Sequence, residues 1–303
     1  MIYEISHKTI YEYTDAVSLS HHTVRLQPRD LPNQRCLQAA LEIEPRPGIS
    51  QPQMDYFGNR MTFVTVEGTH RKLIVTAGSR VEVTEAVWPT AAGTPAWEPV
   101  RGLFRDFSFE KIELLQDILE AAQFVYPSAH ILLGPEFTAY AEPSFPAGIP
   151  VLEAVLNLTE RIHSDFKFDP KATTVATPLE TVLQNRRGVC QDFAHLEIAC
   201  LRAMGIPARY VSGYLETDPP PGKPRLAGAD ASHAWMSFFC PGFGWIDVDP
   251  TNNLLPSTRH ITVAWGRDYG DVSPIRGVIL GSGDHTLKVA VDVIPIQEPR
   301  FNW

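Results

Sequence analysis

One cysteine lies in a setting that favours nucleophilic chemistry. Cys190 belongs to the segment G-V-C-Q-D-F-A-H, residues 188–195, where Gly188 permits a sharp turn just before a predicted helix. Backbone N–H groups at the first turn of a helix are unpaired and carry partial positive charge. They favour a thiolate and can hold the oxyanion of a tetrahedral intermediate. An ordinary thiol has a pKa of about 8.5, so reaction at neutral pH also calls for a nearby base such as an imidazole.

Two other segments offer an imidazole and a carboxylate. His233 begins a predicted strand in A-S-H-A-W, residues 231–235, and the aspartates Asp247 and Asp249 lie in G-W-I-D-V-D-P-T, residues 244–251. Taken alone, a histidine on an aromatic strand is more often a packed core residue, and a carboxylate before proline is ordinary turn chemistry. The two aspartates have the same parity along the strand, so spacing does not choose between them.

Together the two segments predict a hairpin. Strand 232–240 is followed by three residues, P-G-F, and then by strand 244–249. With a three-residue loop, His233 faces Thr251 and has Asp249 as its diagonal neighbour on the same face, about 7–8 Å away. An even loop length would place the two on opposite faces. The pattern therefore supports a contact between this imidazole and this carboxylate.

The elements that would position these residues alternate between helix and strand in the second half of the chain. Apolar residues recurring at three and four predict a helix from Cys190 to about Met204, which Gly205 and Pro207 end. Amphipathic periodicity also predicts a helix beginning at Val151, and a short helix ends near residue 188. The segments predicted as strands are 208–215, 232–240 and 244–248.

The first half of the chain favours β structure. Period-2 alternation within residues 1–84 predicts several short strands of an antiparallel sandwich, among them Met61–Val66, Leu73–Ala77 and Val81–Val83. Residues 85–149 are interpreted as a linker and helical segment, with a helix near Lys111 to Ala122. A core spanning residues 150–260 follows, and strands within residues 261–303 complete the sheets. The expected fold class is α+β.

Composition excludes several classes of protein. The chain has 303 residues, 44% of them hydrophobic and 20% charged, with a net charge of −9, so neither a disordered protein nor a nucleic-acid binder is expected. There is no apolar run of about 18 residues and no signal-like start, so we expect no membrane association and a cytoplasmic location. The four cysteines form no C-x-x-C pair, and we expect neither a metal nor a cofactor.

The chemical segments together resemble the core of the transglutaminase-like superfamily. That family has its nucleophile after a glycine at a helix start, its histidine before Ala-Trp on a strand, and its aspartate before Pro-Thr. Here these are Cys190, His233 and Asp249, in the expected order. The segment G-I-P-A-R-Y-V-S-G-Y, residues 205–214, is similar to the family's helix-to-strand segment. The resemblance covers roughly residues 150–260, and the N-terminal sandwich resembles the β domain that precedes this core in bacterial members.

The resemblance implies a papain-like core, in which the helix bearing the cysteine packs on an antiparallel sheet. Cys190 would attack the carbonyl of a peptide or other amide and form an acyl-thioester. His233 would act as the base, and Asp249, preferred over Asp247 by the resemblance, would orient the imidazole. Water as acceptor gives hydrolysis, and an amine gives acyl transfer.

Four further residues are weaker candidates for the site. Gln184 lies six residues before the cysteine, the spacing that papain-like proteases use for their oxyanion glutamine, although an exposed helix residue is the plainer interpretation. Trp235, Arg267 and Tyr269 are candidates for a substrate cleft; core packing and local contacts within the turn are the simpler alternatives. His195 lies on another face of the helix from Cys190 and is expected to be structural.

Two alternatives to an enzyme are considered. A binding or scaffold protein on the same fold would be expected to lack a member of the triad, and none is missing. A zinc site made of Cys190, His233 and Asp249 is chemically conceivable. A cysteine at a helix start beside a histidine and an aspartate needs no metal to be nucleophilic. The sequence specifies neither the substrate nor the oligomeric state.

Overall fold

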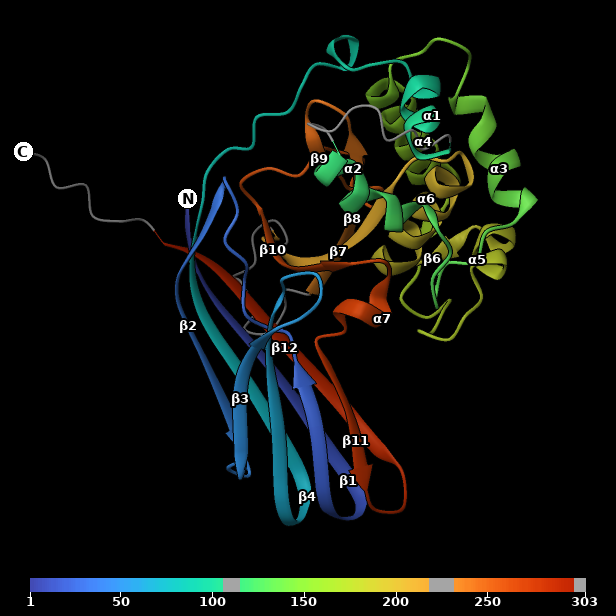
Figure 1. The fold of residues 1–303 in the computed structure, drawn as a ribbon. Coiled ribbons are helices and arrows are strands. Elements are labelled where there is room, and N and C mark those ends of the chain that lie inside the picture. Colours follow the sequence, from blue (N-terminus) through green and yellow to red (C-terminus); the bar gives the residue numbers. More distant parts are fainter. Residues whose placement is uncertain (106–114, 218–231, 297–303) are drawn as a thin grey trace, which may run out of the picture.

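The computed structural model describes residues 1–105, 115–217 and 232–296 and has the predicted α+β fold (Figure 1). An antiparallel sheet forms one elongated part of the molecule, and helices packed around a second sheet form the other. Among the described residues no helix combines the length and apolar character needed to span a membrane.

The N-terminal sheet is built on two long strands, β1 (Ile2–Val24) and β4 (Arg60–Val83). Its order is β11–β1–β4–β2, while β12 also pairs with β1, and β3 with β4. The shorter strands are β2 (Gln34–Glu44), β3 (Ile49–Met54), β11 (Ile275–Leu280) and β12 (His285–Ile296). The prediction of several short strands is wrong, because the three runs between residues 61 and 83 all belong to β4. A β-bulge near Val17 shifts the register and interrupts the alternation without ending the strand.

The two C-terminal strands, β11 and β12, both pair with the N-terminal strand β1. β12 pairs with residues 2–13 of β1, and β11 pairs with residues 19–24, so both ends of the described chain contribute to one sheet (Figure 1).

The second sheet carries the chemical residues. It has the order β10–β7–β8–β9, with every pair antiparallel, and consists of β7 (Ala208–Leu215), β8 (Ser232–Cys240), β9 (Gly244–Val248) and β10 (His260–Gly266). The predicted hairpin register is confirmed, since Cys240 pairs with Gly244. A separate two-stranded parallel pair, β5 (Lys167–Phe168) with β6 (Arg187–Gly188), precedes the central helix.

Helices surround this sheet in Figure 1. They are α1 (Trp97–Arg105), α2 (Leu115–Ala122), α3 (Pro135–Ala141), α4 (Val151–Asp165), α5 (Leu179–Asn185), α6 (Cys190–Ala203) and α7 (Tyr269–Val272), with short 3₁₀ turns η1 (Ala91–Gly93), η3 (Gln123–Val125) and η4 (Glu142–Ser144). The predicted helix over 111–122 is present as α2 from residue 115; residues 111–114 lie outside the described part of the chain.

The central helix α6 is confirmed almost to the residue, and every side chain from Asp192 to Arg202 is buried. It packs on β7 and β8 and contacts α3, α4 and α5. Burying a side chain such as Phe193 or Leu196 contributes about 1.5–3 kcal/mol, so the helix that carries Cys190 is anchored along its length.

Candidate active site

Cys190 is the first residue of α6 and is partly exposed. The carboxylate of Asp192 holds this first turn by accepting hydrogen bonds from the N–H of Val189 at 2.8 Å and the hydroxyl of Thr173 at 2.6 Å. Burial raises the pKa of Asp192, although these two hydrogen bonds oppose it. Gly188 is needed here because a Cβ would lie 2.6 Å from an oxygen of the Asp192 carboxylate. Gly188 therefore allows the backbone to lie close to Asp192, whose carboxylate fixes the first turn of α6.

His233 links the thiol to a carboxylate. It lies near the start of β8, is 9% exposed, and interacts with the side chain of Cys190. Its Nε2 lies 2.8 Å from Oδ2 of Asp249. Burial alone would lower the pKa of His233, but the hydrogen bonds to Asp249 and Cys190 outweigh it and raise the pKa to about 10. The ring is therefore readily protonated beside the sulfur.

Asp249 is fully buried immediately after β9. Its Oδ1 accepts hydrogen bonds from the backbone N–H groups of Thr251 at 2.9 Å and Asn252 at 3.2 Å. Its Oδ2 faces Nε2 of His233, Nε2 of His260 at 3.0 Å and the side-chain amide of Asn252 at 2.7 Å. Burial would raise the pKa of Asp249, but the hydrogen bonds from the two histidines hold it well below its usual range. The carboxylate stays ionised.

Sequence reasoning missed His260 and Asn252. Asn252 follows the D-P-T motif directly, where turn residues commonly bond to a preceding aspartate. His260 begins β10, one residue before the strand that the alternation indicated. The missing information was the strand order, which places β10 and β8 on either side of β7.

Asp247 has a different environment from Asp249. Its carboxylate accepts hydrogen bonds from the hydroxyl of Ser237 at 2.6 Å and the indole N–H of Trp235 at 3.2 Å. Nε of the buried Arg209 in turn donates to the Ser237 hydroxyl at 3.3 Å. The structure therefore joins His233 to Asp249 and ties Asp247 into the packing of the sheet.

Comparison with known proteins identifies the family of the chain. Residues 3–82 match the family described as bacterial transglutaminase-like N-terminal region, and residues 140–250 match the transglutaminase-like superfamily. An uncharacterized protein from Mycobacterium tuberculosis is 39% identical over 307 residues, covering 97% of this chain and 93% of that protein. The chain belongs to the transglutaminase-like superfamily.

A second relative matches part of the chain, and one solved structure matches its fold. A protein-glutamine gamma-glutamyltransferase from Pseudomonas aeruginosa is 30% identical over 131 residues, which are 43% of this chain and 19% of that enzyme. A crystal structure from Cytophaga hutchinsonii, described as a "putative cysteine protease", superposes with a TM-score of 0.71 at 20% identity, covering 100% of this chain and 94% of that one. The latter likeness shows that the two share a fold.

One of the further predictions on this transglutaminase-like core, Trp235 as a cleft residue, is wrong, and a second, Gln184, stays a prediction. Trp235 has no exposed surface, so it cannot line a substrate cleft. Its ring packs instead against His233, with centroids 6.0 Å apart, and His260, at 5.2 Å. Gln184 is exposed on α5, and within the described residues it makes no hydrogen bond to Cys190, His233 or Asp249. An oxyanion donor bonds to the substrate, so the absence of these contacts leaves Gln184 a prediction.

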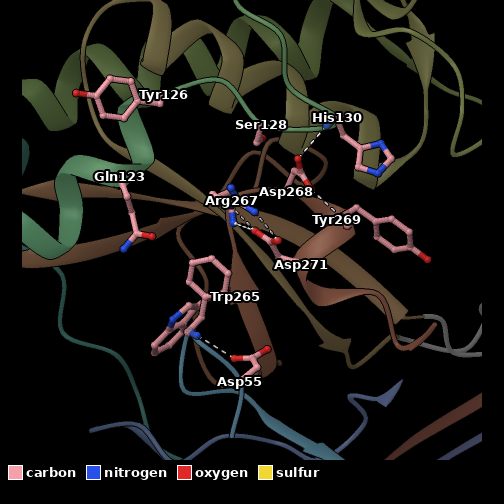
Figure 2. Close-up of polar contacts among 12 residues, drawn as sticks. Asp55, Gln123, Tyr126, Ser128, His130, Trp265, Arg267, Asp268, Tyr269 and Asp271 are labelled. Carbon is pink, nitrogen blue, oxygen red and sulfur yellow. Dashed lines mark hydrogen bonds and ion pairs between the residues drawn. The ribbon is translucent and has the colours of Figure 1, made fainter. Parts of the chain in front are cut away.

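Arg267 and Tyr269 lie at the far end of β10 (Figure 2). The guanidinium of Arg267 pairs with the carboxylate of Asp271 at 2.9 Å, a local contact across one turn. The backbone N–H of Tyr269 donates to Nε2 of His195 at 3.1 Å. Burial lowers the pKa of His195 to about 3, so this histidine is a neutral acceptor that holds the turn. The structure thus supports the structural interpretation of His195.

One group of side chains has the composition of a metal site. Ligand atoms of His233, Asp249 and His260 lie within 4.8 Å of one another. The hydrogen bonds among these atoms already satisfy the carboxylate, so the cluster is accounted for as a hydrogen-bond network.

Proposed function

We propose that this protein is a thiol-dependent enzyme acting on amide bonds, with Cys190 as nucleophile, His233 as general base and acid, and Asp249 as the group that orients the imidazole. The observation that carries the proposal is that one imidazole, His233, bonds to the buried carboxylate of Asp249 and interacts with the Cys190 thiol at the start of α6. An ionised, fully buried carboxylate behind an imidazole is the arrangement that stabilises an imidazolium beside a reactive thiol.

The acylation step follows from the atoms available. Because Nε2 of His233 is engaged by Asp249, Nδ1 is the nitrogen left for the thiol. Nδ1 takes the thiol proton, and Sγ of Cys190 bonds to the amide carbonyl carbon while the carbonyl electrons move to oxygen. The N–H groups at the start of α6 supply positive potential for this oxyanion. When the tetrahedral intermediate collapses, the C–N bond breaks, His233 protonates the departing amine and an acyl-thioester remains.

The second step regenerates the thiol. Water or an amine gives a proton to His233 and bonds to the acyl carbon, the C–S bond breaks, and the sulfur recovers the proton. Water yields hydrolysis and an amine yields acyl transfer. One relative described above is a protein-glutamine gamma-glutamyltransferase, and the structural neighbour is described as a "putative cysteine protease". Both descriptions fit a peptide or other amide as the acyl donor.

Selective alkylation tests the proposal. Iodoacetamide near pH 6 is expected to label Cys190 stoichiometrically, as measured by peptide mass spectrometry. Burial raises the pKa of the other three thiols, to about 11 for Cys240, and holds Cys200 away from solvent. Cys36 is the most informative internal control, because it is partly exposed like Cys190 but has no imidazole partner in the described structure.

The variant His233→Gln should abolish this selectivity while the protein remains folded. Equal labelling of Cys190 and Cys36 in the wild type would contradict the proposal. Once the thiol is shown to be reactive, the acyl-enzyme can be trapped from a lysate. The mass of its acyl group, measured by mass spectrometry, would identify the substrate.

A further inference from the structure

His260 lies outside the segment 140–250 that matches the superfamily, yet it contacts the centre of the proposed triad. Its Nε2 is 3.0 Å from Oδ2 of Asp249, the same oxygen that lies 2.8 Å from Nε2 of His233. Asp249 is 0%, His260 6% and His233 9% exposed. One buried carboxylate oxygen is therefore held between two imidazoles.

The strand order builds this arrangement. Gly213 lies on β7, between β8 and β10, and pairs with His233. A Cβ at this position would lie 2.2 Å from the carbonyl oxygen of Ile261 and 2.5 Å from the ring of Trp235. The indole therefore packs over the glycine and reaches both His233 and His260. Because the indole packs against both imidazole rings, neither ring can turn freely away from the carboxylate.

We propose that His260 is a positioning residue for the triad: it bonds to the same carboxylate oxygen of Asp249 as His233 does and shares its negative charge. This inference rests on the proposed function. A carboxylate that accepts a second N–H is a weaker partner for the first. His260 therefore limits how strongly Asp249 stabilises the imidazolium of His233, which keeps that imidazolium acidic enough to protonate a departing amine.

Other charges near this pair must be held constant in a test. Glu197 on α6 interacts electrostatically with Asp249. His260 also lines a cavity of about 410 Å³ together with Glu216 and Arg259, which form an ion pair at 3.7 Å. Substitutions of His260 alone leave all of these groups in place.

The test compares variants of His260 that keep or remove the donor. His260→Gln places an amide N–H near the position of Nε2, whereas His260→Phe fills the ring's space without a donor. In His260→Phe the pH profile of Cys190 alkylation is expected to move to lower pH by about 0.5–1 unit, because His233 is then the one imidazole that bonds to Asp249. His260→Gln should retain the wild-type profile, and so should His285→Phe, a matched control on the exposed part of β12.

If His260→Phe does not fold, His260→Asn replaces it, because its amide ends short of the carboxylate and should give the same shift. An unchanged profile in the folded donor-less variant, a shift to higher pH, or an equal shift in His260→Gln would overturn the role of His260. Any of these results together with selective labelling of wild-type Cys190 leaves the proposed function intact. Absence of that selective labelling in the wild type would instead count against the proposed function itself.

Discussion

Asp247 and Asp249 are two residues apart, share one face of the hairpin and are both shielded from solvent to a large degree, yet they have different partners. Asp249 faces two histidines, and an imidazole nitrogen can serve as a hydrogen-bond donor or acceptor. Asp247 accepts hydrogen bonds from an indole and a hydroxyl, which keep their protons at all ordinary pH values. The donors around a carboxylate therefore decide whether it can take part in proton transfer. The residue type and the parity along the strand do not, since both are shared by these two aspartates.

The largest expected effect separates the two aspartates by thiol reactivity. Asp249→Asn removes the charge that stabilises the imidazolium of His233, so the rate of Cys190 alkylation near pH 6 should fall by about 100-fold. Asp247→Asn should leave this rate near the wild-type value, because Asp247 forms no hydrogen bond with the imidazole, and its partners Trp235 and Ser237 keep their own side chains. Alkylation quenched at successive times and analysed by peptide mass spectrometry gives both rates. Similar losses in the two variants would remove the distinction drawn between the two carboxylates.

Stability should show the reverse order. Arg209 is deeply buried between the rings of Trp245 and Trp265, at 4.1 and 3.8 Å from their centroids, and Asp247 is its nearby counter-charge. Removing that charge in Asp247→Asn leaves a buried guanidinium uncompensated, so the free energy of unfolding should fall by about 2–4 kcal/mol.

Urea unfolding monitored by tryptophan fluorescence measures this loss. Asp271→Asn is the matched control, because it breaks the ion pair with the half-exposed Arg267 and should cost less than about 1 kcal/mol. A loss in Asp247→Asn no greater than in this control would show that Asp247 does not compensate Arg209.

The sequence was sufficient for the parts of the site that depend on local geometry. The helix start at Cys190 follows from apolar periodicity. A three-residue hairpin loop supported the His233–Asp249 contact, and the family resemblance chose Asp249 over Asp247. The second histidine could not be found in this way, because His260 reaches Asp249 across a strand order that no local pattern encodes. Trp235 was correctly placed on the same face as His233. Its packing over Gly213 of β7 and against His260 of β10 was not foreseen.

The N-terminal sheet illustrates the same limit. Alternation correctly indicated antiparallel strands, because it reports which side chains face the core. It did not reveal that β1 and β4 continue through a bulge, since a register shift resets the pattern just as the end of a strand does.

A third carboxyl group, Glu197 in the core, extends the comparison to a group that forms no ion pair within the described residues. It is fully buried, its Oε2 has no hydrogen-bond partner among the described residues, and its Oε1 lies 2.7 Å from the hydroxyl of Thr159. That hydroxyl also lies 2.8 Å from the carbonyl oxygen of Val155. A hydroxyl has a single proton, so when Thr159 donates to the carbonyl, Glu197 must supply the proton of the other hydrogen bond. The geometry therefore favours a protonated Glu197.

The smallest expected effect is a change in the pH dependence of stability in Glu197→Gln. Burial raises the pKa of Glu197 to about 8, so between about pH 5 and 7 the folded wild type keeps a proton that the unfolded chain has lost. The wild type consequently loses stability from this group as pH rises, whereas the neutral glutamine does not titrate. The variant should gain about 1.4 kcal/mol relative to the wild type for each pH unit in this range, and the gain should level off above about pH 8. Urea unfolding at pH 5.5 and 6.5 measures the difference, and parallel stability curves would show that Glu197 is already ionised in the folded protein.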